Sequence, residues 1–271
     1  MTKHSTVTTP THQAASDLLW HTWHSGAVID TLPAHCKPTD RAQAYAVQAL
    51  LEQRSTRPLV GWKIAATSVS GQKHINVSGP IAGRLLAERV HAQGAVLALT
   101  GNRMRVAEPE FVFRMGQDLP PRAAAYSVDE VMVAVADLYL GIEVPDSRFE
   151  NFVTAGEPQL IADNACAHEF ILGHAAPDVW RSIDLSQHPV QASVQGTARN
   201  MTRQGSGANV LGDPRTALTW LANELRGLGI PLAQGQVVTT GTCMQPLELQ
   251  AGDVVEADFG VLGRVQAQFS A

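Results

Sequence analysis

Two carboxylates separated by one proline lead into an apolar run in the stretch Arg105-Val-Ala-Glu-Pro-Glu-Phe-Val-Phe-Arg114. In an extended strand, side chains two positions apart project from the same face, so Glu108 and Glu110 are expected to lie together. Neighbouring carboxylates repel each other unless a positive group lies between them. Pro109 cannot donate a hydrogen bond to a sheet, which favours a strand end or a bulge here.

A third carboxylate, Glu143, lies 33 residues beyond Glu110 in a second short apolar stretch. Three converging carboxylates would form an all-oxygen site for Mg²⁺ or Mn²⁺, with water or substrate at the remaining positions. The alternative is a solvated face on which Glu108 and Glu110 pair with Arg105 and Arg114. The spacing alone allows both interpretations.

Lys63 lies in the otherwise apolar segment Gly61-Trp-Lys-Ile64. Lysine is rarely fully buried without a partner. Near an acidic cluster, burial lowers the pKa of a lysine while the carboxylates raise it, and a lysine tuned in this way can move protons. The alternative is a solvent-exposed lysine on an edge strand.

Composition narrows the class of protein. A length of 271 residues with 45% hydrophobic residues is enough for a sizeable core. The net charge of −5 argues against nucleic acid and acidic membrane surfaces as partners. Three widely spaced cysteines without a CxxC pair favour reduced thiols. The first 13 residues lack the apolar segment of a signal peptide, so we predict a cytoplasmic protein.

The order of the patterns predicts three segments. Residues 1–13 are expected to be a disordered tail, residues 14–58 an N-terminal helical subdomain, and residues 59–271 a β-rich core. Within the core, two helices are expected, one from the capping box at Ser127 to Leu140 and one from Asp213 to Gly227. Nine strands are expected at residues 59–66, 95–99, 110–114, 141–144, 169–173, 189–196, 236–240, 253–259 and 263–269.

Several common motifs are incomplete. The pair Gly205 and Gly207 lacks the third glycine of a dinucleotide loop, because position 210 is valine. His168-Glu169 lacks the second histidine of a zinc protease helix, and the sequence has no GxSxG nucleophile elbow. The sequence therefore gives no support for Rossmann, zinc-protease or serine-hydrolase chemistry.

Several blocks of sequence, taken together, resemble the fumarylacetoacetate hydrolase superfamily. The resemblance is closest to its branch of 2-oxopent-4-enoate hydratases and 4-oxalocrotonate decarboxylases, and it covers residues 14–271. The blocks, in order, are Gly61-Trp-Lys-Ile-Ala-Ala-Thr-Ser68 with Gln72, Glu108-Pro-Glu110, Gly141-Ile-Glu143 with Asp146-Ser-Arg148, Asp163-Asn164, and Gly205 to Gly212 with Pro214.

The resemblance implies a fold and a set of site residues. The fold would be α+β, a mixed β-roll or sandwich core with an N-terminal helical subdomain. Glu108, Glu110 and Glu143 would bind Mg²⁺ or Mn²⁺, and Lys63 would be the catalytic lysine. The implied substrate-binding residues are Gln72, Asp163, Asn164, Gly241 and Thr242.

The resemblance also implies a reaction. The chain would be a metal-dependent hydratase that adds water to a 2-hydroxypenta-2,4-dienoate-like 2-oxo acid in aromatic-compound catabolism. A 4-oxalocrotonate-type decarboxylase, a non-catalytic 2-oxo acid-binding protein and a fumarylpyruvate-type hydrolase are the alternatives. Ile81 lies at or near a position where hydratases of the family often carry an aspartate, which puts the precise substrate in question. A homo-oligomer and a complex with a paralogous lyase are the expected assemblies.

Overall fold

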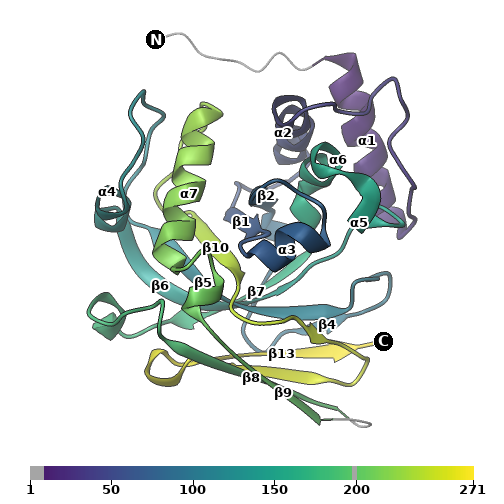
Figure 1. Cartoon of the computed structure of the whole chain (residues 1–271). Coiled ribbons are helices and arrows are strands. Elements are labelled where there is room, and N and C mark those ends of the chain that lie inside the picture. The colour runs from purple at the N-terminus through teal and green to yellow at the C-terminus, as the bar shows by residue number, and fades with distance from the viewer. Residues whose placement is uncertain (1–8, 197–199) are drawn as a thin grey trace.

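The computed structural model describes residues 9–196 and 200–271. Its helices lie above one large sheet, and a smaller sheet lies below the large one (Figure 1). The C-terminus lies at the end of β13 (Arg264–Ser270), in the smaller sheet. The helices are α1 (Pro10–Ser25), α2 (Arg41–Ala49), α3 (Val69–His74), α4 (Val128–Val133), α5 (Phe152–Ala155), α6 (Glu157–Ala162) and α7 (Pro214–Gly227). None of these helices is long and apolar enough to cross a membrane.

The described strands form two sheets with mixed pairing, which confirms the α+β class. The large sheet has the order β2-β1-β10-β5-β6-β7-β3, with β11 paired to β5. Its strands are β1 (Gly61–Ala65), β2 (Ile81–Leu85), β3 (Val90–Ala92), β5 (Val106–Met115), β6 (Val135–Val144), β7 (Glu169–Ala175), β10 (Val237–Thr242) and β11 (Leu247–Glu248). The small sheet has the order β4-β13-β12-β8-β9, from β4 (Val96–Ala98), β13 (Arg264–Ser270), β12 (Val254–Asp258), β8 (Pro189–Gln195) and β9 (Asn200–Ser206).

The alternation of side chains along β5 separates the core from the site. Phe111 is fully buried on the face that packs on the small sheet, where its ring contacts Phe259 edge-on at 5.1 Å between ring centroids. Glu108, Glu110 and Val112 point to the opposite face, because side chains alternate along a strand. The same strand therefore supplies core residues below and carboxylates above.

Curling of the large sheet brings β1 towards β6. These strands are three positions apart in the sheet, which is about 14 Å on a flat sheet. Lys63 on β1 and Glu143 on β6 nevertheless approach to 2.9 Å. The large sheet thus forms a roll whose inner face carries both residues, as the expected β-roll requires.

The N-terminal helix starts earlier than expected. Thr9 caps α1 by accepting a hydrogen bond from the His12 N–H, and Pro10 occupies the first turn, where proline is well tolerated. Residues 10–13 of the expected disordered tail are therefore helical, and residues 1–8 lie outside the described residues. The expected boundary between residues 58 and 59 stays a prediction.

The helix expected to end at Leu140 is much shorter. Ser127 and Glu130 form the expected capping box, but α4 ends at Val133 and β6 begins at Val135. A ladder with β5 that extends as far as Glu143 supplies backbone hydrogen bonds that local helix propensity does not outweigh. Strands β2, β3, β9 and β11 and helices α3, α5 and α6 are additional elements that the patterns did not predict.

Truncation of a core side chain on α7 tests this packing. We expect Leu221→Ala, at a fully buried position, to lower the free energy of unfolding by about 2–5 kcal/mol through cavity formation. Val133→Ala, at a position that is 75% exposed on α4, should change it by less than about 0.5 kcal/mol. Urea unfolding followed by circular dichroism measures both; equal effects would contradict the packing described for α7.

Candidate metal centre and active site

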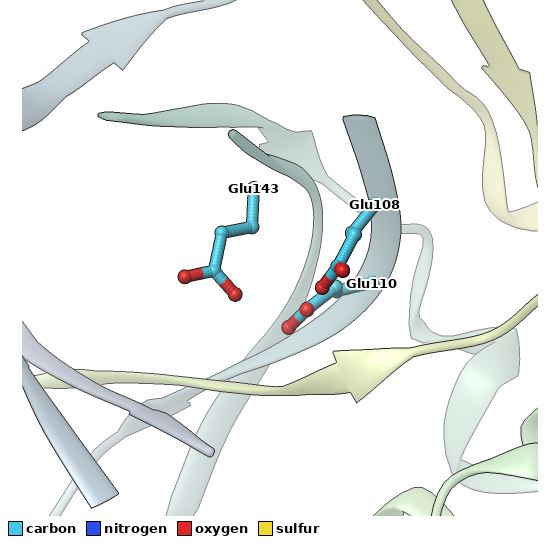
Figure 2. A group of neighbouring side chains, drawn as sticks. All are labelled: Glu108, Glu110 and Glu143. Atoms are coloured by element: carbon cyan, nitrogen blue, oxygen red, sulfur yellow. The ribbon is translucent and has the colours of Figure 1, made fainter. Parts of the chain in front are cut away.

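Three glutamates converge on the inner face of the roll. Glu108 and Glu143 are direct partners across the β5–β6 ladder, and Glu110 pairs with Gly141 in the same ladder. One carboxylate oxygen from each glutamate lies within 4.8 Å of the others. Figure 2 shows Glu108 and Glu110 side by side with Glu143 facing them. This is the arrangement of an oxygen site for a divalent cation.

The Glu110 carboxylate is held by strand β10. Its Oε2 accepts hydrogen bonds from the Thr239 hydroxyl and from the Gly241 N–H, the latter at 2.8 Å. A Cβ on Gly241 would lie 2.1 Å from Thr67 Oγ1, and its φ of +100° favours glycine. Glycine is therefore required at position 241 to bring the β10 backbone against Glu110.

Three buried oxygens of the triad remain without hydrogen bonds. Glu110 Oε1 and both carboxylate oxygens of Glu143 have no hydrogen-bond partner among the described residues, and Glu143 Oε1 has an ion pair with Lys63. Glu110 is fully buried, Glu143 is 1% exposed and Glu108 is half-buried. Unpartnered buried carboxylate oxygens are costly unless a proton or a cation binds them. The donor set therefore fits a hard divalent cation, and the acidic cluster could bind one.

The pKa values of all three carboxyl groups are raised. Burial is the main cause, and the negative charge of Glu143 also raises the pKa values of Glu108 and Glu110. The pKa of Glu108 reaches about 7, and that of Glu110 is well above its ordinary value. Lys63 opposes these shifts without cancelling them, so one lysine does not neutralise the cluster.

Lys63 is 3% exposed, which contradicts the alternative of a solvent-exposed lysine. Its Nζ pairs with Glu143 Oε1 at 2.9 Å and donates to the Ala165 carbonyl at 2.8 Å. Burial lowers the pKa of Lys63, but Glu143 and Glu108 raise it more, and the net direction is upward. Because an ammonium has three N–H donors, one remains for a reactant.

The predicted substrate-binding residues have different local partners. Asp163 accepts from the Ser147 hydroxyl at 2.7 Å and pairs with Arg148. Asn164 binds the backbone of Arg84 through both ends of its amide.

The other three predicted residues are also engaged. Gln72 donates to the Ala66 carbonyl from α3 at 3.1 Å, and the Thr242 hydroxyl donates to the Met244 carbonyl at 2.9 Å. Gly241 touches the site directly, through Glu110. Their role in binding substrate stays a prediction.

Three contributors to the site escaped the sequence analysis. Thr239 binds Glu110, Ala165 accepts from Lys63 through its carbonyl, and Gly83 makes room for Lys63, because a Cβ there would lie 3.0 Å from Lys63 Cγ. An isolated glycine inside an apolar strand was the available signal for Gly83, since such a glycine often marks a close approach. Thr239 acts through a hydroxyl group and Ala165 through its backbone carbonyl, and neither group produces a recognisable pattern in the sequence.

A cavity of about 550 Å³ lies elsewhere, lined by residues of α1, β3, β4 and β7, such as Glu169, and by Arg89 and Arg148 from the connecting segments. No triad residue lines it. Its charged side chains are paired, Arg89 with Glu169 and Arg148 with Asp163. The unsatisfied carboxylates make the triad the stronger candidate for chemistry.

Comparisons with known proteins show which family this chain resembles over most of its length. The fumarylacetoacetate (FAA) hydrolase C-terminal family model matches residues 51–270. The TodF product hydratase of Pseudomonas putida is 32% identical over 280 residues, covering 100% of this chain and 99% of that protein. The 2-keto-4-pentenoate hydratase of Burkholderia vietnamiensis is 31% identical over 249 residues, covering 91% and 92% respectively. The 4-oxalocrotonate decarboxylase from Pseudomonas putida G7, solved with magnesium and adipate, has a TM-score of 0.84 at 25% identity and covers 95% of this chain and 97% of its own.

Cation binding at the triad is expected to depend on pH. Because the pKa of Glu108 is raised from 4.5 to about 7, protonation of Glu108 stabilises the folded metal-free protein. This stabilisation is complete below about pH 4.5 and is lost as the pH rises through about 7. A cation competes with these protons. We therefore expect Mg²⁺ to raise the Tm more at about pH 8 than at about pH 6, measured by differential scanning fluorimetry against chelator.

Charge removal at one ligand provides the control for this measurement. Glu110→Gln keeps the shape of the side chain and should abolish the Mg²⁺-dependent rise in Tm. Glu150→Gln removes a half-exposed carboxylate that pairs with Arg103, and the Mg²⁺ response should survive it. An undiminished response in Glu110→Gln would overturn the assignment of the triad.

Proposed function

The chain belongs to the fumarylacetoacetate hydrolase family, and we propose that it is a metal-dependent lyase that hydrates a 2-hydroxypenta-2,4-dienoate-like 2-oxo acid. The observation that carries the proposal is a buried lysine in contact with a triad of carboxylates whose oxygens remain unsatisfied. Relatives named as hydratases align with nearly the whole chain. We place the reaction in the breakdown of aromatic compounds, because such dienoates are products of ring cleavage.

Glu108, Glu110 and Glu143 would hold the cation, and we propose Mg²⁺ or Mn²⁺ because all three ligands are hard oxygens. When bound, such a cation supplies Lewis acidity towards the 2-oxo group of the substrate. Thr239 and Gly241 fix Glu110 from the side of β10, so that its Oε1 remains available as a ligand. The roll thus orients the carboxylates before a cation arrives.

Lys63 is the candidate proton carrier. Hydration first requires a proton to leave the 2-hydroxyl group and another to reach C5, which gives a 2-oxo-3-enoate. The oxygen of water then bonds to C4 and the water gives up one proton, while the C3=C4 double bond becomes a single bond and C3 takes up a proton. Lys63 Nζ pairs with Glu143 Oε1 at 2.9 Å, and its burial keeps bulk water from competing for its protons.

Gly241 and Thr242 are proposed to line the substrate site because they follow Thr239 on β10 and adjoin Glu110. Gln72 lies on α3, just beyond Thr67, whose side chain is beside Gly241. The proximity of Gln72 to this segment supports its predicted role in binding substrate. For Asp163 and Asn164 a role in binding substrate stays a prediction; their side chains bond to Ser147 and to the Arg84 backbone.

A decarboxylase acting on a 2-oxo-3-enedioate is the second candidate. It is favoured by the similarity in structure to the 4-oxalocrotonate decarboxylase and by Ile81. Ile81 is fully buried on β2, opposite Ala65, and an isoleucine there can neither donate nor accept a proton. The same carboxylates and lysine would serve both reactions, so only turnover separates the two.

The expected cellular setting extends the proposal. We propose a cytoplasmic homo-oligomer, and a complex with a paralogous lyase of the same pathway, on the basis of the family resemblance. Three free and buried cysteines, Cys36, Cys166 and Cys243, are compatible with a reducing compartment. Light scattering during size-exclusion chromatography measures the oligomer directly.

Ultraviolet absorbance measures the proposed reaction. Freshly generated 2-hydroxypenta-2,4-dienoate should lose its absorbance with Mg²⁺ but not with chelator, and 4-hydroxy-2-oxopentanoate should form. Carbon dioxide released only from 2-oxo-hex-3-enedioate would instead establish the decarboxylase. If neither substrate reacts while Mg²⁺ still binds, the proposed hydratase function is wrong.

Replacement of Lys63 tests its role in proton transfer. Lys63→Met retains most of the length and apolar stem of the side chain but cannot carry a proton. We expect kcat to fall by about 10²–10⁴-fold, the usual contribution of a positioned acid or base. Lys37→Ala, at an exposed lysine that donates to Thr31, is the control and should keep the wild-type kcat. Retention of full activity by Lys63→Met would exclude this role.

A further inference from the structure

We propose that the left-handed turn Asn164-Ala165-Cys166 is the element that positions Lys63, and that Asn164 is its principal positioning residue. This inference rests on the proposed role of Lys63 as the proton carrier. It assigns to Asn164 a task different from the predicted contact with substrate.

The turn has an unusual backbone. Asn164, Ala165 and Cys166 have φ values of 56°, 52° and 60°, so three consecutive residues other than glycine are left-handed. Such residues are normally found singly, because Cβ crowds the following carbonyl. A turn of this kind persists only where surrounding contacts hold it, and such strained backbone clusters at functional sites.

The turn directs one backbone carbonyl at the lysine. Ala165 is fully buried, and its carbonyl oxygen accepts the hydrogen bond from Lys63 Nζ at 2.8 Å. The second contact of that ammonium is Glu143. A lysine side chain has four rotatable carbon bonds, so these two contacts determine where its charged end lies. Without the carbonyl, only the attraction to the carboxylates would hold the ammonium in place.

The turn also packs directly on strand β2. A Cβ on Gly83 would lie 2.3 Å from the Asn164 carbonyl oxygen and 3.0 Å from Lys63 Cγ. Any larger residue at position 83 would push the turn and the lysine stem apart. Gly83 is the direct neighbour of Lys63 across the β1–β2 ladder, so turn, strand and lysine meet at one point.

The Asn164 side chain completes the edge of the large sheet. Strand β2 is the last strand on its side, and its outer edge would otherwise leave backbone groups of Arg84 buried and unpaired. Asn164 Oδ1 accepts from the Arg84 N–H at 2.6 Å, and its Nδ2 donates to the Arg84 carbonyl at 2.9 Å. A carboxamide carries one acceptor and one donor in the geometry of a peptide group. Asn164 thus replaces a neighbouring strand and anchors the turn.

Further contacts hold the segments that adjoin the turn. Asp163, immediately before it, pairs with the buried Arg148 guanidinium. Gln48 of α2 donates to the carbonyls of Ala82 on β2 and of Ile161 on α6, the helix that leads into the turn. Helix α2 is thereby bonded to β2, the strand that pairs with β1 and Lys63.

A double-mutant cycle separates this positioning role from general stability. We expect Asn164→Ala to lower kcat by about 100-fold, the scale of a misplacement of about 1 Å, with little change in the Mg²⁺ requirement. In a Lys63→Met background the same substitution should change the remaining rate less than about twofold, because residues that act together are non-additive. A full 100-fold loss in that background would overturn the proposal.

A second readout needs neither metal nor turnover. The chain has four lysines, so ¹⁵N-lysine labelling allows the Lys63 ammonium to be followed by NMR and assigned with Lys63→Met. In the wild type, the buried ammonium is held by the Ala165 carbonyl and by Glu143, so its protons should exchange slowly with water. In Asn164→Ala, where the carbonyl no longer holds it, the exchange should be about tenfold or more faster. Unchanged exchange in Asn164→Ala would contradict the proposal. If the wild type turns over neither substrate, the proposed function fails while this measurement still decides the role of the turn.

A matched control exists on α7. Asn223 also binds both backbone groups of one residue, accepting from the Tyr126 N–H at 2.8 Å and donating to its carbonyl at 3.0 Å. Asn223→Ala should lower stability but leave kcat and Lys63 exchange unchanged. If Asn164→Ala does not fold, Asn164→Asp keeps the acceptor for the Arg84 N–H, loses the donor and should change both readouts in the same direction. Normal kcat and exchange in Asn164→Asp would then refute the proposal.

Discussion

The structure depends on one electrostatic imbalance, three carboxylates held inside a curled sheet with a single lysine beside them. Burial of an ion costs several kcal/mol even after the protein relaxes around it, and one cation offsets only part of that for three anions. The cost that Lys63 does not offset raises the pKa values of Glu108, Glu110 and Glu143. Binding of protons or of a divalent cation can neutralise the excess negative charge. These two kinds of binding leave different net charges next to Lys63. The fold thus accepts a local cost to stability in order to present oxygen ligands in a fixed arrangement.

Close backbone approach is what keeps that arrangement fixed. Gly241 lets the β10 backbone donate to Glu110, while Gly83 lets the Asn164 turn and the stem of Lys63 pass over β2. Gly141, opposite Glu110, leaves room for Phe170, whose ring would be 2.4 Å from a Cβ at that position. All three glycines lie in strands, where glycine is intrinsically unfavourable. Each glycine weakens its strand locally, and in return it allows a neighbouring group to pack close to the strand.

The sequence predicted which carboxylates and which lysine lie together better than it predicted the backbone around them. Glu108, Glu110 and Glu143 carry a signature of type and spacing, and the structure brings them together beside Lys63 as expected. The helix expected to reach Leu140 was wrong beyond Val133, because the long ladder between β5 and β6 outweighs a local helical start. The left-handed turn could not be foreseen, since its residues are not glycines and its stabilising contacts come from Arg84 and Arg148, distant in sequence. Local patterns report local preferences, whereas these features depend on tertiary contacts.

The position of Ile81 bears on how one site can serve two reactions. Decarboxylation and hydration of related 2-oxo acids share the need for a cation and a proton carrier, so the triad and Lys63 do not choose between them. The choice depends on groups near C3, C4 and C5 of the substrate, where either carbon dioxide departs or water adds. Ile81 is on β2, two residues from Gly83, and side chains two positions apart share a face of a strand, so Ile81 projects on the same side of the sheet as Lys63. An aliphatic group there offers water no hydrogen-bonding partner. If hydration occurs, other polar groups must therefore orient the water. Thr67, whose hydroxyl would lie 2.1 Å from a Cβ on Gly241, and Thr242, which follows Gly241 on β10, are two such groups.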